Sequence, residues 1–209
     1  MTDINQIAEA VIDGDIAGAA ALVKEAIEEG KNPSEILNRG LIAGMDKVGE
    51  YFRTNEFYVP EVLMAANAMK NAMNILKPKL IETGEKAKGT VAIGTVKGDQ
   101  HDIGKNLVAM MLEGSGFEVT DLGVDVKPEK FAEAAEKGAD IIGMSALLTT
   151  TMPGMKKVTD LLKEKNLRDK VKIIVGGAPV TQSFADEIDA DAYASDAADA
   201  VLKAKLLLK

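Results

Sequence analysis

A short apolar strand, a glycine-rich turn and a helix follow one another between Val91 and Thr120. The β-branched run ends at Val96, and a helical pattern begins at about Gly104. Such a unit is typical of an α/β domain, and open α/β sheets bind ligands at the carboxyl ends of their strands. The turn carries His101, the single histidine of the chain. A lone loop histidine is as often a plain surface residue, so the turn becomes a candidate site only if other features agree.

Strand and helix patterns alternate five times from this unit onward. This alternation predicts an α/β fold: a flavodoxin-like, doubly wound, five-stranded parallel sheet with helices on both faces. The expected strand order is 2-1-3-4-5, with the switch point between the first and third strands. We expect strands near residues 90–96, 117–121, 140–145, 171–175 and 191–194, and helices near 104–115, 128–138, 152–165, 181–188 and 196–208.

The N-terminal part of the chain shows helical patterns only. Apolar residues recur at helical spacing over 4–12, and a second helix is expected over 15–29. Asn32-Pro33 is a helix start signal for a third helix, and Pro60 lies in the first turn of a fourth helix over 59–81. Four antiparallel helices joined by short loops predict a four-helix bundle.

A polar segment with two glycines, residues 82–89, separates the helical part from the alternating part. It lacks apolar periodicity, which is typical of a linker between domains. We therefore expect a helical bundle over residues 1–83, a linker at 84–89 and an α/β domain over 90–209.

Composition excludes several classes of protein. The 209 residues are 46% hydrophobic and 28% charged, as in ordinary globular proteins. A net charge of −8 argues against a nucleic-acid partner, because phosphate binding needs clustered Lys and Arg. The absence of cysteine excludes disulfides and thiolate metal sites. Neither a signal peptide nor an apolar run of about 20 residues is present, so we expect a soluble, cytoplasmic protein with no membrane partner.

Three short motifs occur in order in the α/β part: Asp99-x-His101-x-x-Gly104, Ser145-x-Leu147 and Gly176-Gly177. Together they resemble the signature of cobalamin-binding domains that hold the cofactor with its nucleotide base displaced by a histidine. The run from Gly98 to Asn106 is similar to the cobalamin-binding module of methionine synthase and to the corrinoid proteins of methyltransferase systems. The resemblance covers about residues 33–203.

The resemblance implies that His101 is the metal ligand. Imidazole suits an axial position of the cobalt in a corrin, and the chain offers no Cys and no other His. Asp99 is close enough along the loop to accept the proton of the other ring nitrogen, although taken alone it would be read as a turn or capping residue. In the family a hydroxyl completes this relay; alignment from Ser145-x-Leu147 puts it at Thr151, where many relatives have serine. The expected catalytic residues are His101, Asp99 and Thr151.

The resemblance also implies contacts to the corrin and to its displaced nucleotide tail, which the switch point of the sheet would accommodate. Glycines at or near strand ends, Gly94 among them, would admit close ligand approach. Without the other motifs, Ser145 and Leu147 would be read as a strand end and a core leucine. The bundle is expected to cover the upper corrin face. The expected cofactor-binding residues are Gly98, Asp99, Gln100, His101, Asp102, Ile103, Gly104, Ser145, Leu147, Thr149, Gly176, Gly177 and, over the upper axial position, Tyr58.

The function implied by the resemblance is that of a corrinoid methyl-carrier protein. A chain with one His and no Cys lacks the groups that usually activate a methyl donor or a thiol acceptor. We expect it to shuttle a methyl group on the cobalt of cobalamin, between the methylcobalamin and cob(I)alamin states, and not to be catalytic alone. The expected partners are a substrate-specific methyltransferase, a second methyltransferase that passes the methyl group from the corrinoid to tetrahydrofolate or a thiol, and a reductive activation protein.

Other classes stay open from the sequence. A cobalamin-dependent isomerase subunit shares the α/β domain but would not be expected to have the N-terminal bundle. A cobalamin-dependent sensor shares both parts but usually couples them to a DNA-binding or signalling segment, for which the first 30 residues are too short and too acidic. An α/β domain without a cofactor would leave three motifs in order unexplained.

Overall fold

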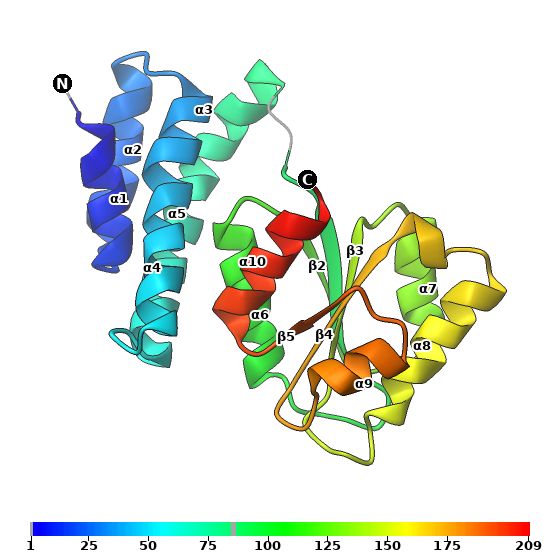
Figure 1. Cartoon of the computed structure of the whole chain (residues 1–209). Helices are drawn as coiled ribbons and strands as arrows, with labels where there is room; N and C mark the ends of the chain where they lie inside the picture. The colour runs from blue at the N-terminus through cyan, green and yellow to red at the C-terminus, as the bar shows by residue number, and fades with distance from the viewer. Residues whose placement is uncertain (1, 85–86) are drawn as a thin grey trace. The chain divides into compact units, whose positions relative to one another are not determined.

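The computed structural model describes residues 2–84 and 87–209 (Figure 1). The chain divides into two compact units, Met1–Ala87 with Glu113–Gly116, and Lys88–Leu112 with Phe117–Lys209. The linker expected at 84–89 includes Glu85 and Lys86, which lie outside the described residues. None of the helices described is long and apolar enough to span a membrane.

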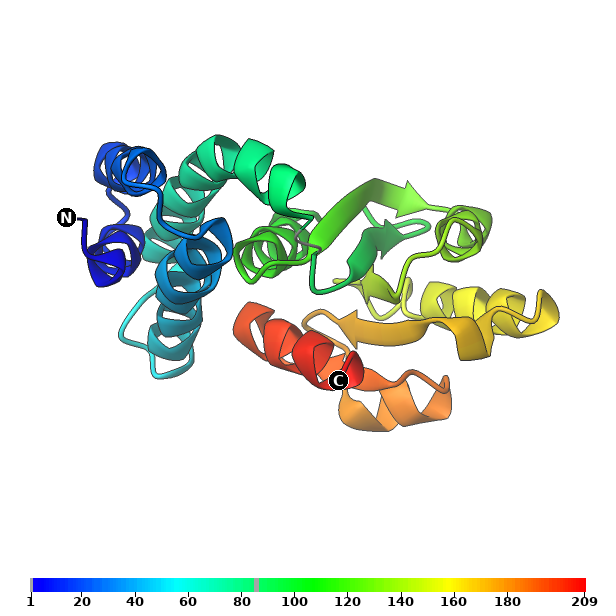
Figure 2. The ribbon, with the colours of Figure 1, turned by 90° about the horizontal axis from the view of Figure 1, so that it is seen from above.

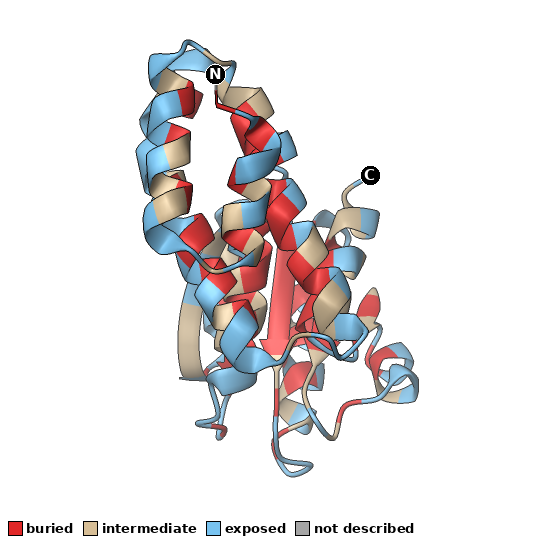
Figure 3. Ribbon diagram, turned by 90° about the vertical axis from the view of Figure 1, so that its left-hand side faces the viewer, coloured by how far each residue is buried: buried red, intermediate tan, exposed pale blue. Residues whose placement is uncertain are grey.

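The first unit is a helical bundle whose buried residues lie on the inner faces of its helices (Figure 3). Asp3 and Asp15 cap the first two helices by accepting hydrogen bonds from Asn5 N and Gly18 N. The expected four-helix arrangement is confirmed, with the third helix built from three consecutive segments. The helices are α1 (Ile4–Ile12), α2 (Ile16–Glu28), α3 (Pro33–Glu35), η1 (Ile36–Ile42), α4 (Ala43–Arg53) and α5 (Val59–Thr83).

The middle segment of the third helix, η1, is a π-helix. The apolar periodicity predicted a helix here but did not reveal its wider turns, because a segment of seven residues is too short to separate the α-helical from the π-helical period. Two glycines in and after this segment face α1. A Cβ on Gly44 would lie 2.9 Å from the Ala8 carbonyl oxygen and 3.0 Å from Val11 Cβ. Close packing of the first and third helices therefore depends on glycine at this position.

The second unit is a five-stranded parallel sheet with the order β2-β1-β3-β4-β5, which confirms the expected doubly wound topology (Figures 1 and 2). Helices α7 and α8 cover one face, and α6 and α10 lie on the other. The strands are β1 (Thr90–Val96), β2 (Glu118–Val126), β3 (Ile141–Ser145), β4 (Lys172–Gly176) and β5 (Ala192–Ala194). The helices are α6 (Ile103–Gly114), α7 (Pro128–Glu136), α8 (Pro153–Glu164), η2 (Arg168–Lys170), α9 (Gln182–Glu187) and α10 (Ala197–Leu207).

The strand register brings the ends of the central strands into one row. Thr95 pairs with Ser145, Ser145 with Gly176, and Gly176 with Ala194. Because all strands are parallel, the loops that follow β1, β3 and β4 leave the sheet at the same edge. The three sequence motifs are therefore gathered at one edge of the sheet.

Strand β2 is longer than expected. The sequence predicted a strand that ends near residue 121, but pairing with β1 continues to Val126 through two register irregularities. Gly123 and Asp125 both have positive φ, +90° and +52°. Glycine and aspartate inside an apolar run resemble a strand end, yet here they belong to bulges that the sheet absorbs.

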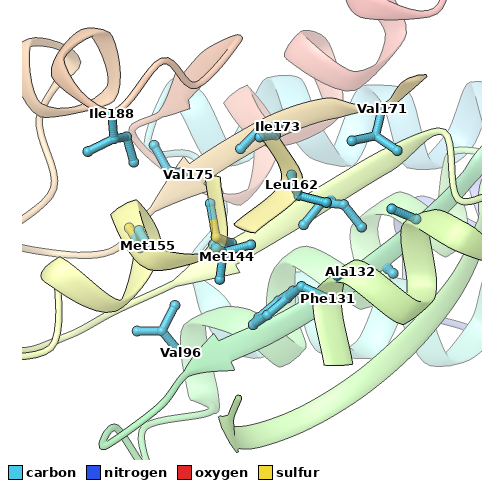
Figure 4. Close-up of a cluster of buried hydrophobic side chains, with 14 of the residues drawn as sticks. Val96, Phe131, Ala132, Met144, Met155, Leu162, Val171, Ile173, Val175 and Ile188 are labelled. Atoms are coloured by element: carbon cyan, nitrogen blue, oxygen red, sulfur yellow. The ribbon is translucent and has the colours of Figure 1, made fainter. Parts of the chain in front are cut away.

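The core of the α/β unit lies between the sheet and helices α7 and α8 (Figure 4). Phe131 is fully buried, and its ring fills the space that a side chain at Gly94 would need. A Cβ on Gly94 would lie 3.0 Å from Phe131 Cζ and 3.1 Å from Val126 Cγ2. The expectation that Gly94 admits a ligand is therefore wrong, because this glycine makes room for the core.

Candidate functional site

His101 lies in the turn that joins β1 to α6, and its side chain is 51% exposed. The turn is held from below by Thr95, the buried residue next to the end of β1. Thr95 Oγ1 donates a hydrogen bond to the His101 carbonyl oxygen at 2.8 Å. The imidazole is thus exposed at the edge of the sheet, and the backbone of His101 is held by Thr95.

Asp99 fixes the orientation of the imidazole. Its carboxylate is fully buried, and Oδ1 accepts hydrogen bonds from His101 N at 3.1 Å and from His101 Nδ1 at 2.7 Å. With the proton on Nδ1, the lone pair of Nε2 is available to a metal. Within the described part of the chain, no hydrogen bond to Nε2 is present. The ring therefore has the tautomer and the free nitrogen that a metal ligand needs.

The second oxygen of Asp99 is bound by the loop after β3. Oδ2 accepts hydrogen bonds from Leu147 N at 2.8 Å, Leu148 N at 3.3 Å and Thr151 Oγ1 at 2.7 Å. Burial by itself raises the pKa of Asp99, but the hydrogen bonds from Leu147, Thr151 and His101 outweigh it and hold the pKa well below the usual aspartate range. Asp99 is therefore an anion that can keep the proton on His101 Nδ1 in place.

Thr151 is buried in the turn before α8. Its hydroxyl oxygen lies 2.7 Å from Asp99 Oδ2 and 2.8 Å from the Leu148 carbonyl oxygen. A hydroxyl carries one proton and can donate it to only one of these acceptors at a time. A serine could make the same two contacts, since only the hydroxyl is used.

Three apolar side chains on the loops around His101 are exposed to solvent. Ile103 is 79% exposed, and Leu147 and Leu148 are each 42% exposed. A Cβ on Gly104 would meet no atom within 4 Å. Exposed apolar side chains beside the imidazole are suited to binding a large apolar ring.

Several other expected site residues stand on the same loops. Gln100 and Thr149 are exposed, and Ser145 is half-buried at the end of β3. Asp102 accepts a hydrogen bond from Asn106 Nδ2 at 3.1 Å, one turn along α6. These residues are near the sheet edge by position in the fold, but their side chains take no part in the network around Asp99.

The Gly176-Gly177 pair has a structural reason of its own. Gly177 has φ +128°, and a Cβ there would lie 1.9 Å from the Ala146 carbonyl oxygen. No other residue would fit without moving the backbone. The pair therefore allows the loops after β3 and β4 to run close together, whatever ligand they bind.

Tyr58 belongs to the first compact unit, at the N-terminus of α5, and is 64% exposed. Its backbone N–H donates to Glu61 Oε2 at 2.9 Å, which caps the start of that helix.

The sequence did not single out Thr95, Leu148 or Asp125, although all three hold the His101 loop or Asp99. Asp125 Oδ1 accepts a hydrogen bond from Gly98 N at 2.7 Å. The signal for Asp125 was the run Gly123-x-Asp125 inside a strand pattern, which indicates a bulge. Thr95 and Leu148 carried no comparable signal.

Comparison with known proteins identifies the family. Residues 89–202 match the B12 binding domain family, and residues 3–77 match a second family of the same description. Dimethylamine corrinoid protein 3 of Methanosarcina acetivorans is 47% identical over 212 residues, which cover 100% of both chains. This chain belongs to the corrinoid proteins of methyltransferase systems.

Solved structures agree with this assignment. A cobalamin-binding protein from Desulfitobacterium hafniense DCB-2 has a TM-score of 0.83 at 33% identity, with 99% of both chains covered. The methanol:cobalamin methyltransferase complex MtaBC from Methanosarcina barkeri has a TM-score of 0.88 at 34% identity, covering 98% of this corrinoid protein and 79% of the matched chain. The corrinoid protein described here therefore binds a cobalamin-type cofactor, and the free Nε2 and the exposed side chains of Ile103, Leu147 and Leu148 fit such a group.

Proposed function

We propose that this corrinoid protein carries a methyl group between two methyltransferases. The first would take the methyl group from a substrate, and the second would pass it to an acceptor such as tetrahydrofolate or a thiol. The full-length similarity to a dimethylamine corrinoid protein supports methylamines as the first donors to test. A reductive activation protein would be the third partner.

One observation carries this proposal, namely the imidazole of His101 with Nε2 free and Nδ1 bound to Asp99 Oδ1 at 2.7 Å. When bound, the corrinoid supplies the cobalt atom that carries the methyl group. His101 would hold the cobalt through Nε2, and Asp99 would hold the Nδ1 proton and the ring orientation. Thr151 would keep the Asp99 carboxylate in place.

The remaining expected contacts are part of the proposal. Gly98, Gln100, Asp102, Ile103 and Gly104 would contact the lower side of the cofactor. The loops after β3 and β4 would take its nucleotide tail through Ser145, Leu147, Thr149, Gly176 and Gly177. The bundle over residues 1–83, with Tyr58, would cover the upper side, and the linker at 84–89 would let it move aside during transfer.

The carrier role agrees with the chemistry that the chain lacks. With no Cys and a single His, it has no thiolate zinc site of the kind that activates a thiol acceptor. Donor and acceptor would therefore be activated on the partner enzymes. The match over the full length to corrinoid proteins favours this role over an isomerase subunit or a sensor.

The ligand assignment is tested on the protein reconstituted with hydroxocobalamin. We expect binding of about one equivalent, and coupling to an imidazole nitrogen in the electron paramagnetic resonance spectrum of the cob(II) form. His101→Ala should lose this coupling and keep its fold, because the His101 side chain is half exposed. If the coupling survives in His101→Ala, another group is the ligand.

The carrier role is tested by methyl transfer. Loaded with reduced corrinoid, the purified protein should not demethylate dimethylamine by itself, and addition of a cognate methyltransferase should start turnover. His101→Ala loaded in the same way is the matched control for turnover in the presence of the methyltransferase. Efficient transfer from dimethylamine to an acceptor by the single chain would contradict the proposal.

A further inference from the structure

Asp125, at the end of β2, contacts the His101 loop at two points. Its Oδ1 accepts a hydrogen bond from Gly98 N at 2.7 Å, and its own N–H donates to the Asp99 carbonyl oxygen at 2.9 Å. These contacts bracket the peptide unit that joins Gly98 to Asp99. Asp125 thus holds the loop on both sides of the Gly98–Asp99 peptide, two residues before His101.

The backbone of β2 is distorted where this contact is made. Between Ile93 and Val96 of β1, strand β2 runs from Asp121 to Val126 and so takes up two additional residues, through two register irregularities. Asp125 itself has φ +52°, a conformation that is uncommon for residues other than glycine, although Asp and Asn tolerate it best. Bulges of this kind redirect side chains near functional sites. Here the irregularity turns Asp125 towards the loop.

The loop needs such a contact. Residues 97–102 form no regular helix or strand, and Gly98 has φ +88°. Glycine has the most backbone freedom of any residue, so the conformation of this turn depends on its hydrogen bonds more than on the restriction of its φ and ψ angles. Thr95 holds the far end of the loop through the His101 carbonyl oxygen at 2.8 Å. At its near end the loop is held by Asp125 and by the hydrogen bond from Asp99 N to the Val96 carbonyl oxygen at 3.1 Å.

We propose that Asp125 is a positioning residue for the ligand histidine, acting through Gly98 and Asp99. Its hydrogen bonds go to the backbone of Gly98 and Asp99 and not to the imidazole. By holding the Gly98–Asp99 peptide, it keeps the Asp99 carboxylate under His101 Nδ1 and so keeps Nε2 aimed outwards. This inference rests on His101 as the proposed axial ligand. If the loop spends less time in this geometry, the apparent Kd for the cofactor rises in proportion.

The test uses two substitutions at position 125 in the full chain. Asp125→Gly removes the carboxylate but keeps the positive φ accessible, so the backbone of β2 is not strained. Asp125→Asn keeps an acceptor oxygen and tolerates the same φ. Asn166→Gly is the matched control, because Asn166 also has positive φ (+56°) and lies in the turn between α8 and η2.

The first measurement is amide hydrogen exchange at Gly98 in the chain without cofactor. Asp125→Gly should exchange about tenfold faster than wild type, since a charge-assisted hydrogen bond is lost, and tenfold corresponds to about 1.4 kcal/mol. Asp125→Asn should stay within about threefold of wild type, and Asn166→Gly should not change the rate. Equal Gly98 exchange in wild type and Asp125→Gly overturns the proposal.

The second measurement follows the histidine itself. After loading with hydroxocobalamin and reduction to the cob(II) form, Asp125→Gly should show a smaller imidazole-coupled fraction and a Kd raised about threefold to tenfold. Asp125→Asn should restore both. A change in thermal stability alone, with coupling and Kd as in wild type, overturns the positioning role. Absence of coupling in the wild type would instead contradict His101 as the ligand, while the Gly98 exchange would still decide whether Asp125 holds the loop.

Discussion

At the scale of single residues, Asp99 is the centre of the site. Five donors surround its two oxygens, two from His101 and three from the loop after β3. A buried carboxylate is costly to desolvate, and the hydrogen bonds from these groups compensate for the lost hydration of Asp99. The same contacts make Asp99 intolerant of isosteric replacement.

We expect Asp99→Asn to lower the free energy of unfolding by about 2 kcal/mol or more at pH 7. Whichever way the new amide turns, its NH2 group faces backbone or hydroxyl donors that need an acceptor. Urea denaturation measures the loss. Asp102→Asn is the control, because Asp102 is exposed and has one side-chain hydrogen bond, from Asn106. An equal loss in both variants would contradict the central role of Asp99.

The pH dependence follows from the lowered pKa of Asp99. A carboxyl group whose pKa is lower in the folded chain binds fewer protons there than in the unfolded chain. Its stabilisation is therefore complete above the unfolded value of about 3.9 and is lost as the pH falls towards the folded value. Below about pH 4, the stability of wild type should fall more steeply than that of Asp99→Asn in urea melts. Parallel curves would show that Asp99 does not titrate differently on folding.

A substitution at Gly104 should affect cofactor binding without affecting the stability of the fold. A methyl group there meets no atom within 4 Å, and alanine is a better helix former than glycine. Gly104→Ala should leave the stability of the cofactor-free chain unchanged or slightly higher, yet weaken cobalamin binding about tenfold or more if the corrin lies against this residue. Denaturation and binding titration measure the two effects. Unchanged binding would remove Gly104 from the site.

At the scale of elements, an ion pair joins α6, the helix that follows the His101 loop, to strand β2. Lys105 is buried in the first turn of α6, and its Nζ lies 2.7 Å from both carboxylate oxygens of Asp121 on β2. On the other face of the sheet, Phe131 of α7 packs into the space above Gly94 of β1. The ion pair thus joins α6 to β2, and Phe131 packs on β1 from the opposite face.

Gly94→Ala should destabilise the chain by about 1–3 kcal/mol, the usual cost of overpacking a close-packed core. The new methyl group would lie 3.0 Å from Phe131 Cζ, so the ring or the strand must move. Adding Phe131→Leu to Gly94→Ala should cost less than the sum of the single changes, which a double-mutant cycle by urea denaturation measures. Strict additivity would mean that the two residues are not in conflict.

At the scale of the whole molecule, every residue that holds His101 belongs to the second compact unit. Thr95, Asp99, Asp125, Leu147 and Thr151 all lie between residues 88 and 209. The bundle supplies none of these hydrogen bonds. Ligation of the cofactor and coverage of its upper side are therefore expected to be separable properties.

A fragment comprising residues 88–209 should bind hydroxocobalamin and show the same imidazole coupling in the cob(II) form as the full chain. The same fragment with His101→Ala is its control. Loss of coupling in a folded fragment, judged by circular dichroism, would show that the bundle is needed to set the ligand and would contradict this division of roles.

The order and type of most elements could be predicted from the sequence, because each depends on contacts within a few residues. The alternating β-branched and helical runs predicted five parallel strands, and the resulting doubly wound pattern predicted their order. The tight spacing of Asp99 and His101 within one turn is also local. The missed details, the π-helical η1 and the longer β2, are places where the chain departs from regular periods.

Only the tertiary structure decided how the site is held. Leu147 and Thr151 reach Asp99 from 48 and 52 residues away, and Asp125 reaches Gly98 from 27 residues away. Such contacts depend on the register of parallel strands, which brings the ends of β1, β2 and β3 to one edge of the sheet. The sequence by itself determined the histidine, the motifs and the topology. The fold determined that Asp99 is buried and charged, that Gly94 serves the core, and that a bulge turns Asp125 onto the loop, because these depend on atoms that are distant along the chain.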